Sequence, residues 1–138
     1  METFVRHRRL LEATALALDL PMCSVLLMND ATLPWLILVP RRAGVREIYE
    51  LERPDRIILM EEMTLASRVA CALYRPDKLN IGALGNVVDQ LHIHVVCRYR
   101  SDRAWPGPVW GADGSRAYAD GGLAAEAVRV KKAFEDAL

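Results

Sequence analysis

The sequence predicts a single α+β domain built on an antiparallel sheet. Three features predict this fold class: two apolar runs at residues 23–30 and 34–40, a long amphipathic segment at 53–74, and a further apolar run at 90–100 in which polar residues alternate. Strands joined by short turns, with helices set around them, are typical of α+β domains. The chain has 138 residues, which fits one domain spanning 1–138.

At the N-terminus, residues 2–18 are predicted to form a helix that ends before Pro21. Six side chains lie near one face of this helix: Phe4, Leu10, Leu11, Thr14, Ala15 and Leu18. Glu12 interrupts the apolar stretch and no small-residue cleavage site follows, so the segment is interpreted as a helix and not as a signal peptide. No apolar run approaches the ~20 residues of a membrane span. We therefore expect a cytoplasmic protein without membrane contact.

The first two apolar runs predict a hairpin. Residues 23–30 are expected to form a strand that enters a turn at Asn29 and Asp30. Residues 34–40 are expected to form the second strand, bounded by a proline at each end. The connection between them is longer than the tightest hairpin turns.

Helices are predicted on either side of the later strands. Residues 41–51 predict a loop with one or two helical turns, and the longest helix follows at 53–74, where apolar residues recur at helical spacing. Pro76 ends this helix because proline cannot continue the hydrogen-bond ladder. Residues 124–138 predict a final amphipathic helix, interpreted as structural.

Two more strands and an arm complete the domain. Residues 77–86 predict a short strand that runs into a glycine-containing turn, and residues 90–100 are the clearest strand of the chain. The segment that follows, within 101–122, is rich in Trp, Pro and Gly and is expected to be an ordered loop. Its tryptophans, Trp105 and Trp110, are expected to pack inside the protein or against a partner rather than to contact a base.

Composition limits the partners that the chain can take. Lys plus Arg and Asp plus Glu both number 18, so the formal net charge is zero. A neutral chain lacks the positive field that non-specific nucleic-acid binding needs, and a small partner is expected instead. Cys23, Cys71 and Cys97 show no zinc-ligand spacing and are interpreted as buried free thiols.

The segment Gln90-Leu91-His92-Ile93-His94 carries the strongest chemical signal. Successive side chains of a strand point to opposite faces, so Gln90, His92 and His94 are expected to share one face. Leu91 and Ile93, with Val95, would then pack on the core. A neutral imidazole is a competent nucleophile towards phosphorus near pH 7. A neighbouring histidine or amide can donate to phosphate oxygens as charge develops.

Other interpretations of these histidines stay open. Either one can be a structural side chain, and a His-x-His pair in a strand is also a common metal-ligand pair. No acidic residue or third histidine stands at a spacing that would complete a metal site, since His7 is expected to be solvent-exposed. Arg98 shares strand parity with His94 and could reach a phosphate, although a solvated surface arginine is the favoured interpretation.

Residues 90–96 resemble the histidine-triad (HIT) signature His-φ-His-φ-His-φ-φ, where φ is apolar, with Gln90 in place of the first histidine. Residues 28–40 resemble the nucleotide-facing hairpin of that family, in which an Asn or Asp at the strand end meets the ribose. Asn29 stands at that position, with Asp30 beside it. The resemblance covers about 20–105 as the core, followed by the C-terminal arm and helix, 104–138.

The stretch before the triad resembles the family as well. In the family an amide residue and a glycine-rich turn approach the phosphates there. Asn80, Gly85 and Asn86 match that pattern in place. The resemblance therefore implies five candidate nucleotide-binding residues in this chain, the two of the hairpin and these three.

The resemblance implies a five-stranded antiparallel sheet with flanking helices, paired as a homodimer. It implies nucleotidyl transfer or hydrolysis at the α-phosphate of nucleoside monophosphate derivatives, such as phosphoramidates or dinucleoside polyphosphates of a purine nucleotide. His92 would be the nucleophile of a covalent nucleotidyl-histidine, and His94 would contact the phosphate or position His92. Gln90 would contact the phosphate or position a neighbour. The family's catalytic core contains no metal, and no cofactor is expected.

Two departures from the family pattern define the alternatives. Gln90 cannot exchange a proton at neutral pH, so a nucleotide-binding module with little or no turnover is the alternative function. Many family members carry Gly-His where this chain has Trp35-Leu36, and a bulky Trp there is expected to reshape the pocket wall. A metal-binding strand protein that uses His92 and His94 is the third hypothesis.

Overall fold

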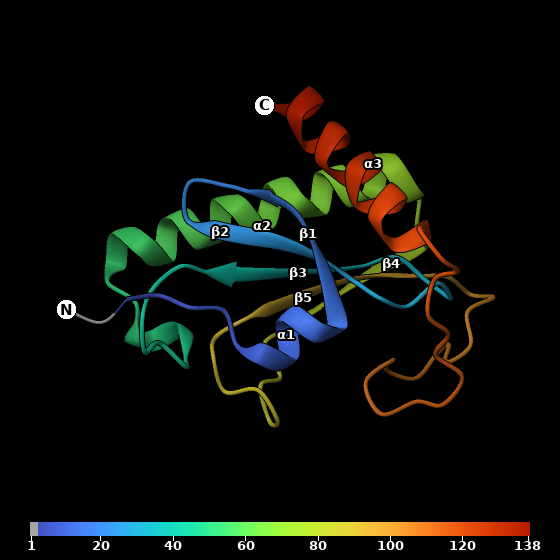
Figure 1. Cartoon of the computed structure of the whole chain (residues 1–138), viewed down its shortest axis with the longest axis horizontal. Coiled ribbons are helices and arrows are strands. Elements are labelled where there is room, and N and C mark those ends of the chain that lie inside the picture. Colours follow the sequence, from blue (N-terminus) through green and yellow to red (C-terminus); the bar gives the residue numbers. More distant parts are fainter. Residues whose placement is uncertain (1–2) are drawn as a thin grey trace.

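The computed structural model describes residues 3–138. Figure 1 shows the elements in chain order: α1 (Arg8–Ala13), β1 (Thr14–Asp19), β2 (Cys23–Met28), β3 (Trp35–Pro40), the 3-10 turn η1 (Ile48–Glu50), α2 (Arg53–Tyr74), β4 (Lys78–Gly82), β5 (Ile93–Arg98) and α3 (Gly122–Ala137). Within the described residues, no helix has the length and hydropathy that crossing a membrane requires.

The strands form one antiparallel sheet in the order β1-β2-β3-β5-β4. β5 is therefore flanked on both sides, with His94 opposite Ile37 of β3 and opposite Gly82 of β4. This confirms the predicted α+β class and its five-stranded antiparallel sheet with flanking helices. A residue of β5 is held by ladder hydrogen bonds to two neighbours, which makes this strand a rigid platform.

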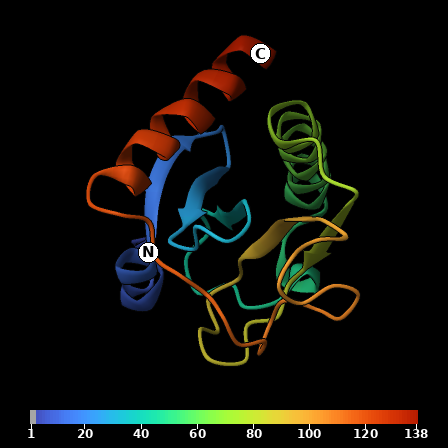
Figure 2. The ribbon, with the colours of Figure 1, turned by 90° about the vertical axis from the view of Figure 1, so that its right-hand side faces the viewer.

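The sheet has two differently covered faces. Figure 2 shows α2 and α3 lying over one of them. Because side chains alternate along a strand, Ile93 and Val95 face these helices, as predicted for the apolar side of the strand. His94 and Val96 face the opposite side, where α1 and the segment after β5 lie. The site is built on this second face.

The predicted N-terminal helix over residues 2–18 is wrong both for residues 3–7 and beyond Ala13. Glu2 lies outside the described residues, α1 spans only Arg8–Ala13, and Thr14–Asp19 form β1 paired with β2. A run of Ala and Leu fits helical and alternating periods about equally, so periodicity alone cannot separate them. Pairing with the edge of the sheet decides in favour of the strand, because β2 would otherwise expose its backbone groups.

The observed bounds of the long helix confirm the prediction. α2 spans Arg53–Tyr74, has Pro54 in its first turn, and ends at Arg75 with φ 48° in the left-handed region. Its buried Glu62 accepts hydrogen bonds from the backbone N–H groups of Met22 and Cys23, at 3.0 and 2.7 Å, and so ties the helix to the start of β2. Of the three cysteines, Cys23 and Cys97 are buried as predicted, but Cys71 is exposed on the outer side of the helix.

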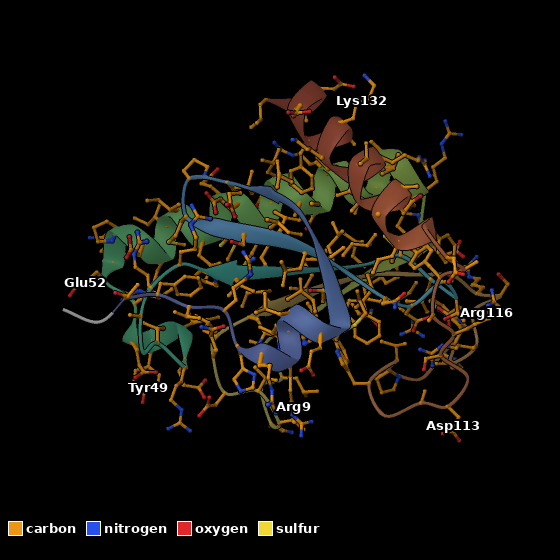
Figure 3. All side chains as sticks on the ribbon, in the orientation of Figure 1. Arg9, Tyr49, Glu52, Asp113, Arg116 and Lys132 are labelled. Carbon is orange, nitrogen blue, oxygen red and sulfur yellow. The ribbon has the colours of Figure 1, made fainter. Side chains whose placement is uncertain are left out.

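The segment between β5 and α3, residues 99–121, folds into an ordered arm that crosses the end of the β2–β3 hairpin. Arg103 forms an ion pair with Asp30 at 2.7 Å, and the backbone N–H of Ala31 donates to the carbonyl of Arg116 at 2.6 Å. Figure 3 places the labelled side chains of Asp113 and Arg116 on the outer edge of this arm. The predicted ordered loop is confirmed.

Arg98 anchors the start of this arm. Its guanidinium is 1% exposed and donates to both carboxylate oxygens of Asp102, to Oδ1 of Asn80 and to the carbonyl of Gly107. The interpretation as a solvated surface arginine is therefore wrong. Because Nε, Nη1 and Nη2 each donate to a protein acceptor and the residue is buried, the alternative of a phosphate contact is not supported either.

Candidate functional site

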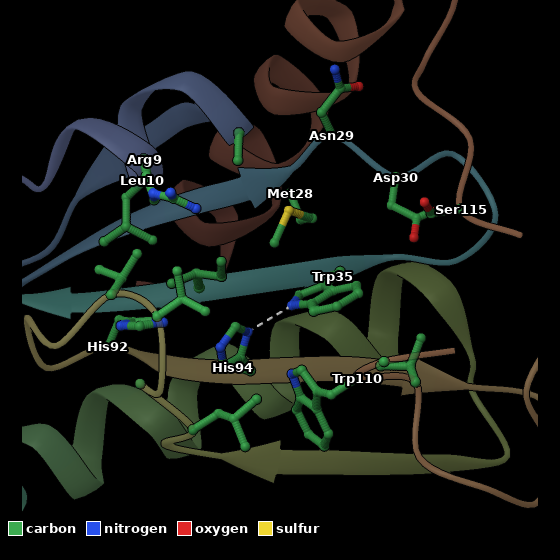
Figure 4. A pocket seen from close by; sticks show the side chains of 18 of the residues that line it. Arg9, Leu10, Met28, Asn29, Asp30, Trp35, His92, His94, Trp110 and Ser115 are labelled. Carbon is green, nitrogen blue, oxygen red and sulfur yellow. Dashed lines mark hydrogen bonds between the residues drawn. The ribbon is translucent and has the colours of Figure 1, made fainter. Parts of the chain in front are cut away.

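A pocket of about 480 Å³ opens on the face of the sheet that α2 and α3 leave free. Figure 4 shows side chains from α1, β2, β3, β5 and the arm converging on it. Its apolar wall is formed by Leu10, Met28, Ile37, Val88, Val109 and Trp110. Its polar groups include Arg9, Asn29, Asp30, His92, His94 and Arg103. Its volume falls within the range of about 300–1,000 Å³ that small-molecule sites occupy.

His94 lies on β5 and is fixed by an indole. Nε1–H of Trp35 donates to Nδ1 of His94 at 2.9 Å, as the dashed line in Figure 4 marks. An indole nitrogen can only donate, so Nδ1 of His94 carries no proton and the neutral ring holds its proton on Nε2. Burial, followed by the charge of His92, lowers the pKa of His94 to about 4. At neutral pH His94 is therefore an uncharged donor.

His92 stands just before β5 and has the opposite arrangement of protons. Its Nδ1 lies 2.7 Å from the carbonyl oxygen of Gln90. A carbonyl oxygen only accepts, so Nδ1 of His92 carries the proton and Nε2 keeps its lone pair. The rings of His92 and His94 lie 4.9 Å apart between centroids and both line the pocket. One ring thus offers a nucleophilic nitrogen and the other an N–H donor.

Gln90 does not join the two histidines. Its Oε1 accepts from the backbone N–H of His7 at 2.8 Å, and its Nε2 donates to the carbonyl of Val5 at 2.7 Å. The prediction of one shared polar face is therefore wrong for Gln90, because β5 begins only at Ile93 and regular alternation does not extend back to residue 90. Its side chain holds the N-terminal segment, and its carbonyl orients His92.

The two predicted hairpin residues, Asn29 and Asp30, line the pocket, but their side-chain oxygens already accept hydrogen bonds from protein groups. Oδ1 of Asn29 accepts from the backbone N–H of Tyr118 at 3.0 Å. Asp30 accepts from Thr32 and from Arg103. Burial raises the pKa of Asp30, but the hydrogen bonds from Thr32 and Arg103 outweigh burial and hold it below its ordinary value. Asp30 is therefore an ionised structural group.

Of the three predicted residues before the triad, only two lie at the pocket. Gly85 and Asn86 line the pocket, and the φ of 61° at Gly85 is a left-handed conformation that favours glycine. Asn80 lies away from the pocket, because its Oδ1 accepts from Arg98 at 2.6 Å. The predicted turn thus reaches the site, whereas the amide of β4 belongs to the buried network under the arm.

Sequence reasoning missed part of the pocket. Trp35 forms part of the wall, as expected for a bulky residue at that position. Trp110 packs against the core as expected, and its ring in addition lines the pocket 5.5 Å from the ring of His94. Arg9 and Leu10 also reach the pocket from α1. The tryptophan-rich composition of the arm could have pointed to Trp110 as a pocket residue. Nothing in the sequence of α1 indicates that Arg9 and Leu10 reach the pocket.

A metal site finds no support in the side chains. Between residues 3 and 138, no three His, Cys, Asp or Glu side chains come together in a way that could hold an ion. His7, the remaining histidine, is half-buried, caps α1 and accepts from the backbone N–H of Arg9 at 3.1 Å. It is thus committed to the helix end rather than freely solvated.

Comparisons with known proteins show the family of the chain. A family model described as the HIT domain matches residues 12–101. A histidine triad protein from Marinobacter aquaeolei VT8 is 42% identical, with a TM-score of 0.93 over 99% of this chain and 100% of that one. Histidine triad proteins from Bradyrhizobium japonicum (41% identity, TM-score 0.89, 98% of each chain) and Sinorhizobium meliloti 1021 (39% identity, TM-score 0.89, 94% of this chain and 96% of that one) are similar. The curated proteins contain no match. The chain belongs to the HIT domain family.

Proposed function

We propose that this chain is a nucleotide hydrolase or nucleotidyl transferase that acts at the α-phosphate of purine nucleoside monophosphate derivatives. Phosphoramidates and dinucleoside polyphosphates are the substrate classes. The observation that carries the proposal is the free Nε2 lone pair of His92 beside the Nε2–H of His94, at the wall of a nucleotide-sized pocket.

The reaction has two displacement steps. In the first, the lone pair on Nε2 of His92 forms a bond to phosphorus, and the leaving group departs with the electron pair of its bond to phosphorus and takes up a proton from solvent. In the second, a water oxygen attacks phosphorus, the phosphorus–nitrogen bond breaks, and its electron pair returns to Nε2 while water loses a proton to solvent. Another acceptor hydroxyl or amine in place of water gives transfer instead of hydrolysis.

Charge develops on His92 when phosphorus is attached. Its ring then carries a positive charge, which the carbonyl of Gln90 stabilises through the proton on Nδ1. Nε2–H of His94 is placed to donate to a non-bridging oxygen of the same phosphate. The backbone of the turn at Gly85 and Asn86 borders the same space.

The rest of the pocket suits a nucleoside. Its apolar wall, with Leu10, Val88 and Trp110, offers a surface on which a base can stack. Asn29 stands at the far end with Nδ2 in no hydrogen bond of the described chain, so it can donate to a ribose hydroxyl. Base, sugar and phosphate thus each meet a matching part of the wall.

The test is to incubate the protein with adenosine phosphoramidate and to measure product release together with the mass of the acid-sensitive adduct. We expect an adduct and turnover in the wild type, and neither in His92→Ala. His7→Asn is the matched control, because Asn also caps helices and residue 7 does not line the pocket. Turnover that persists in His92→Ala would contradict the proposal.

A second candidate is a nucleotide-binding module with little turnover. Two observations favour it. The side chain of Gln90 is hydrogen-bonded to the backbone of His7 and Val5, and the pKa of His94 lies at about 4. Neither group can then protonate a leaving group at neutral pH. Binding of adenosine monophosphate without adduct formation from either substrate class would identify this candidate.

The expected homodimer also stays a proposal. β4 is an edge strand of the sheet, and its Ile81 is 44% exposed. An unpaired edge with an exposed apolar side chain is a place where a second copy can add. Sedimentation equilibrium of the whole chain tests it, and a monomer at all concentrations would contradict it.

A further inference from the structure

We propose that Trp35 is a positioning residue that keeps the proton of His94 on Nε2, so that His94 meets the phosphate only as a neutral donor. The effect on rate rests on the function proposed above. The effect on the protonation state of His94 does not, and it can be measured in the free protein.

The geometry follows from the register of the sheet. Trp35 opens β3 opposite Val96, whereas His94 lies opposite Ile37, so Trp35 and His94 are diagonal neighbours on one face. Diagonal neighbours lie within reach of an aromatic side chain. Trp35 is 8% exposed and His94 is 6% exposed, so water competes little for their 2.9 Å hydrogen bond. The indole therefore occupies the position where a proton on Nδ1 of His94 would point.

Among the described residues, no group near His94 favours its charged form. His92 is the neighbouring titratable group, and Gly82 and Ile37 face His94 from the flanking strands. Asp30 is the only carboxylate among the described residues that line the pocket, and it is paired with Arg103 at 2.7 Å.

Arg9, the other charged group among the described residues of the pocket, is cationic and does not favour an imidazolium. The low pKa of His94, caused by burial and by His92, agrees with this arrangement.

Trp110 provides a matched control. Its ring also meets the ring of His94 edge-on, with centroids 5.5 Å apart, but its Nε1 forms no hydrogen bond in the described chain. Trp110→Phe therefore removes an indole beside His94 without removing a donor to it. Trp35→Phe removes an indole together with the donor.

The first measurement is an imidazole nitrogen NMR titration of the ¹⁵N-labelled protein. We expect wild-type His94 to show an unprotonated Nδ1, a protonated Nε2 and no titration above pH 5. In Trp35→Phe the pKa of His94 rises by one unit or more, whereas in Trp110→Phe the tautomer is retained. A wild-type His94 with its proton on Nδ1 overturns the proposal, and this result needs no variant to fold.

The second measurement separates positioning from packing. In folded Trp35→Phe we expect kcat to fall by about ten- to hundredfold, the cost of a poorly oriented donor, while KM changes by less than about threefold. Trp35→His, which keeps an aromatic N–H donor, restores part of the loss. If the pKa of His94 rises in folded Trp35→Phe as expected and kcat is nevertheless unchanged, the role of Trp35 in the rate is overturned. Absence of any nucleotidyl adduct in the wild type overturns the proposed function instead and leaves the NMR result valid.

Discussion

Nδ1 of His92 lies 2.7 Å from the carbonyl oxygen of Gln90, two residues earlier in the chain. The contact needs the backbone of residue 90 and not its side chain. It leaves Nε2 of His92 as the free nitrogen in the pocket. The residue that departs from the triad pattern therefore still orients the proposed nucleophile, His92, through a group that every amino acid possesses.

Replacing the side chain of Gln90 should thus affect stability more than chemistry. Gln90→Ala removes the two hydrogen bonds to His7 and Val5, which are worth about 1–2 kcal/mol of unfolding free energy together. We expect kcat to change by less than about threefold, because the carbonyl remains in place. Urea unfolding and steady-state kinetics measure the two effects. A hundredfold loss of kcat at unchanged stability would show that the amide acts in the reaction.

The protonation of His94 should make stability depend on pH. Its pKa is about 4 in the folded chain and 6.5 in the reference state, so between these values the unfolded chain binds a proton that the folded chain does not. Stability contributed by neutral His94 is therefore complete above pH 6.5 and is lost as the pH falls towards 4, at about 1.4 kcal/mol per unit of pKa difference. Unfolding curves of wild type and His94→Gln between pH 7 and pH 4 measure it. Parallel slopes in the two proteins would contradict the assignment.

The buried ion pair of Arg98 and Asp102 should hold the arm in place. Hydrogen bonds from Arg98 outweigh burial and hold the pKa of Asp102 far below its ordinary value. Asp102→Ala would leave a cation that is 1% exposed without its partner, which costs about 3–5 kcal/mol. The exposed Lys132–Asp136 pair is the control, because Asp136→Ala should cost less than about 0.5 kcal/mol. Equal melting temperatures of the two variants would refute this role of the network.

Trp110 should contribute to nucleoside binding. Stacking of a base on an aromatic ring is worth about 1–3 kcal/mol, so Trp110→Ala should raise the Kd for adenosine monophosphate by about tenfold. Inhibition by inorganic phosphate should not change, since phosphate lacks a base. Calorimetric titration with both ligands separates the effects. Equal weakening of both would indicate a general collapse of the pocket.

Local signals predicted those parts of the fold that local sequence determines. The bounds of α2 are predictable because Pro76 and helical spacing mark them. His92 and His94 are recognisable from their place in the apolar run at 90–100, although only His94 lies within β5. β1 was missed because alternating Ala and Leu also fit a helix, and only pairing with β2 distinguishes the two.

Long-range partners account for the errors at the site. Asp30 stands beside the position that resembles a ribose-binding residue, but Arg103, 73 residues later, engages its carboxylate. Gln90 matched a triad position, but its partner Val5 lies 85 residues earlier. The sequence favours a surface position for Arg98, but its partners Asn80 and Gly107 come from β4 and the arm and bury it. Such contacts depend on the folded chain and leave no periodic trace in the sequence.

The measurement that tests the central claim most directly is peptide mapping of the protein after rapid quenching with labelled adenosine phosphoramidate. The account predicts one nucleotidyl group, bonded through phosphorus to Nε2 of His92, and its absence from His92→Ala. A nucleotidyl group on His94 or His7, or turnover without any phosphorus–nitrogen bond, would contradict it.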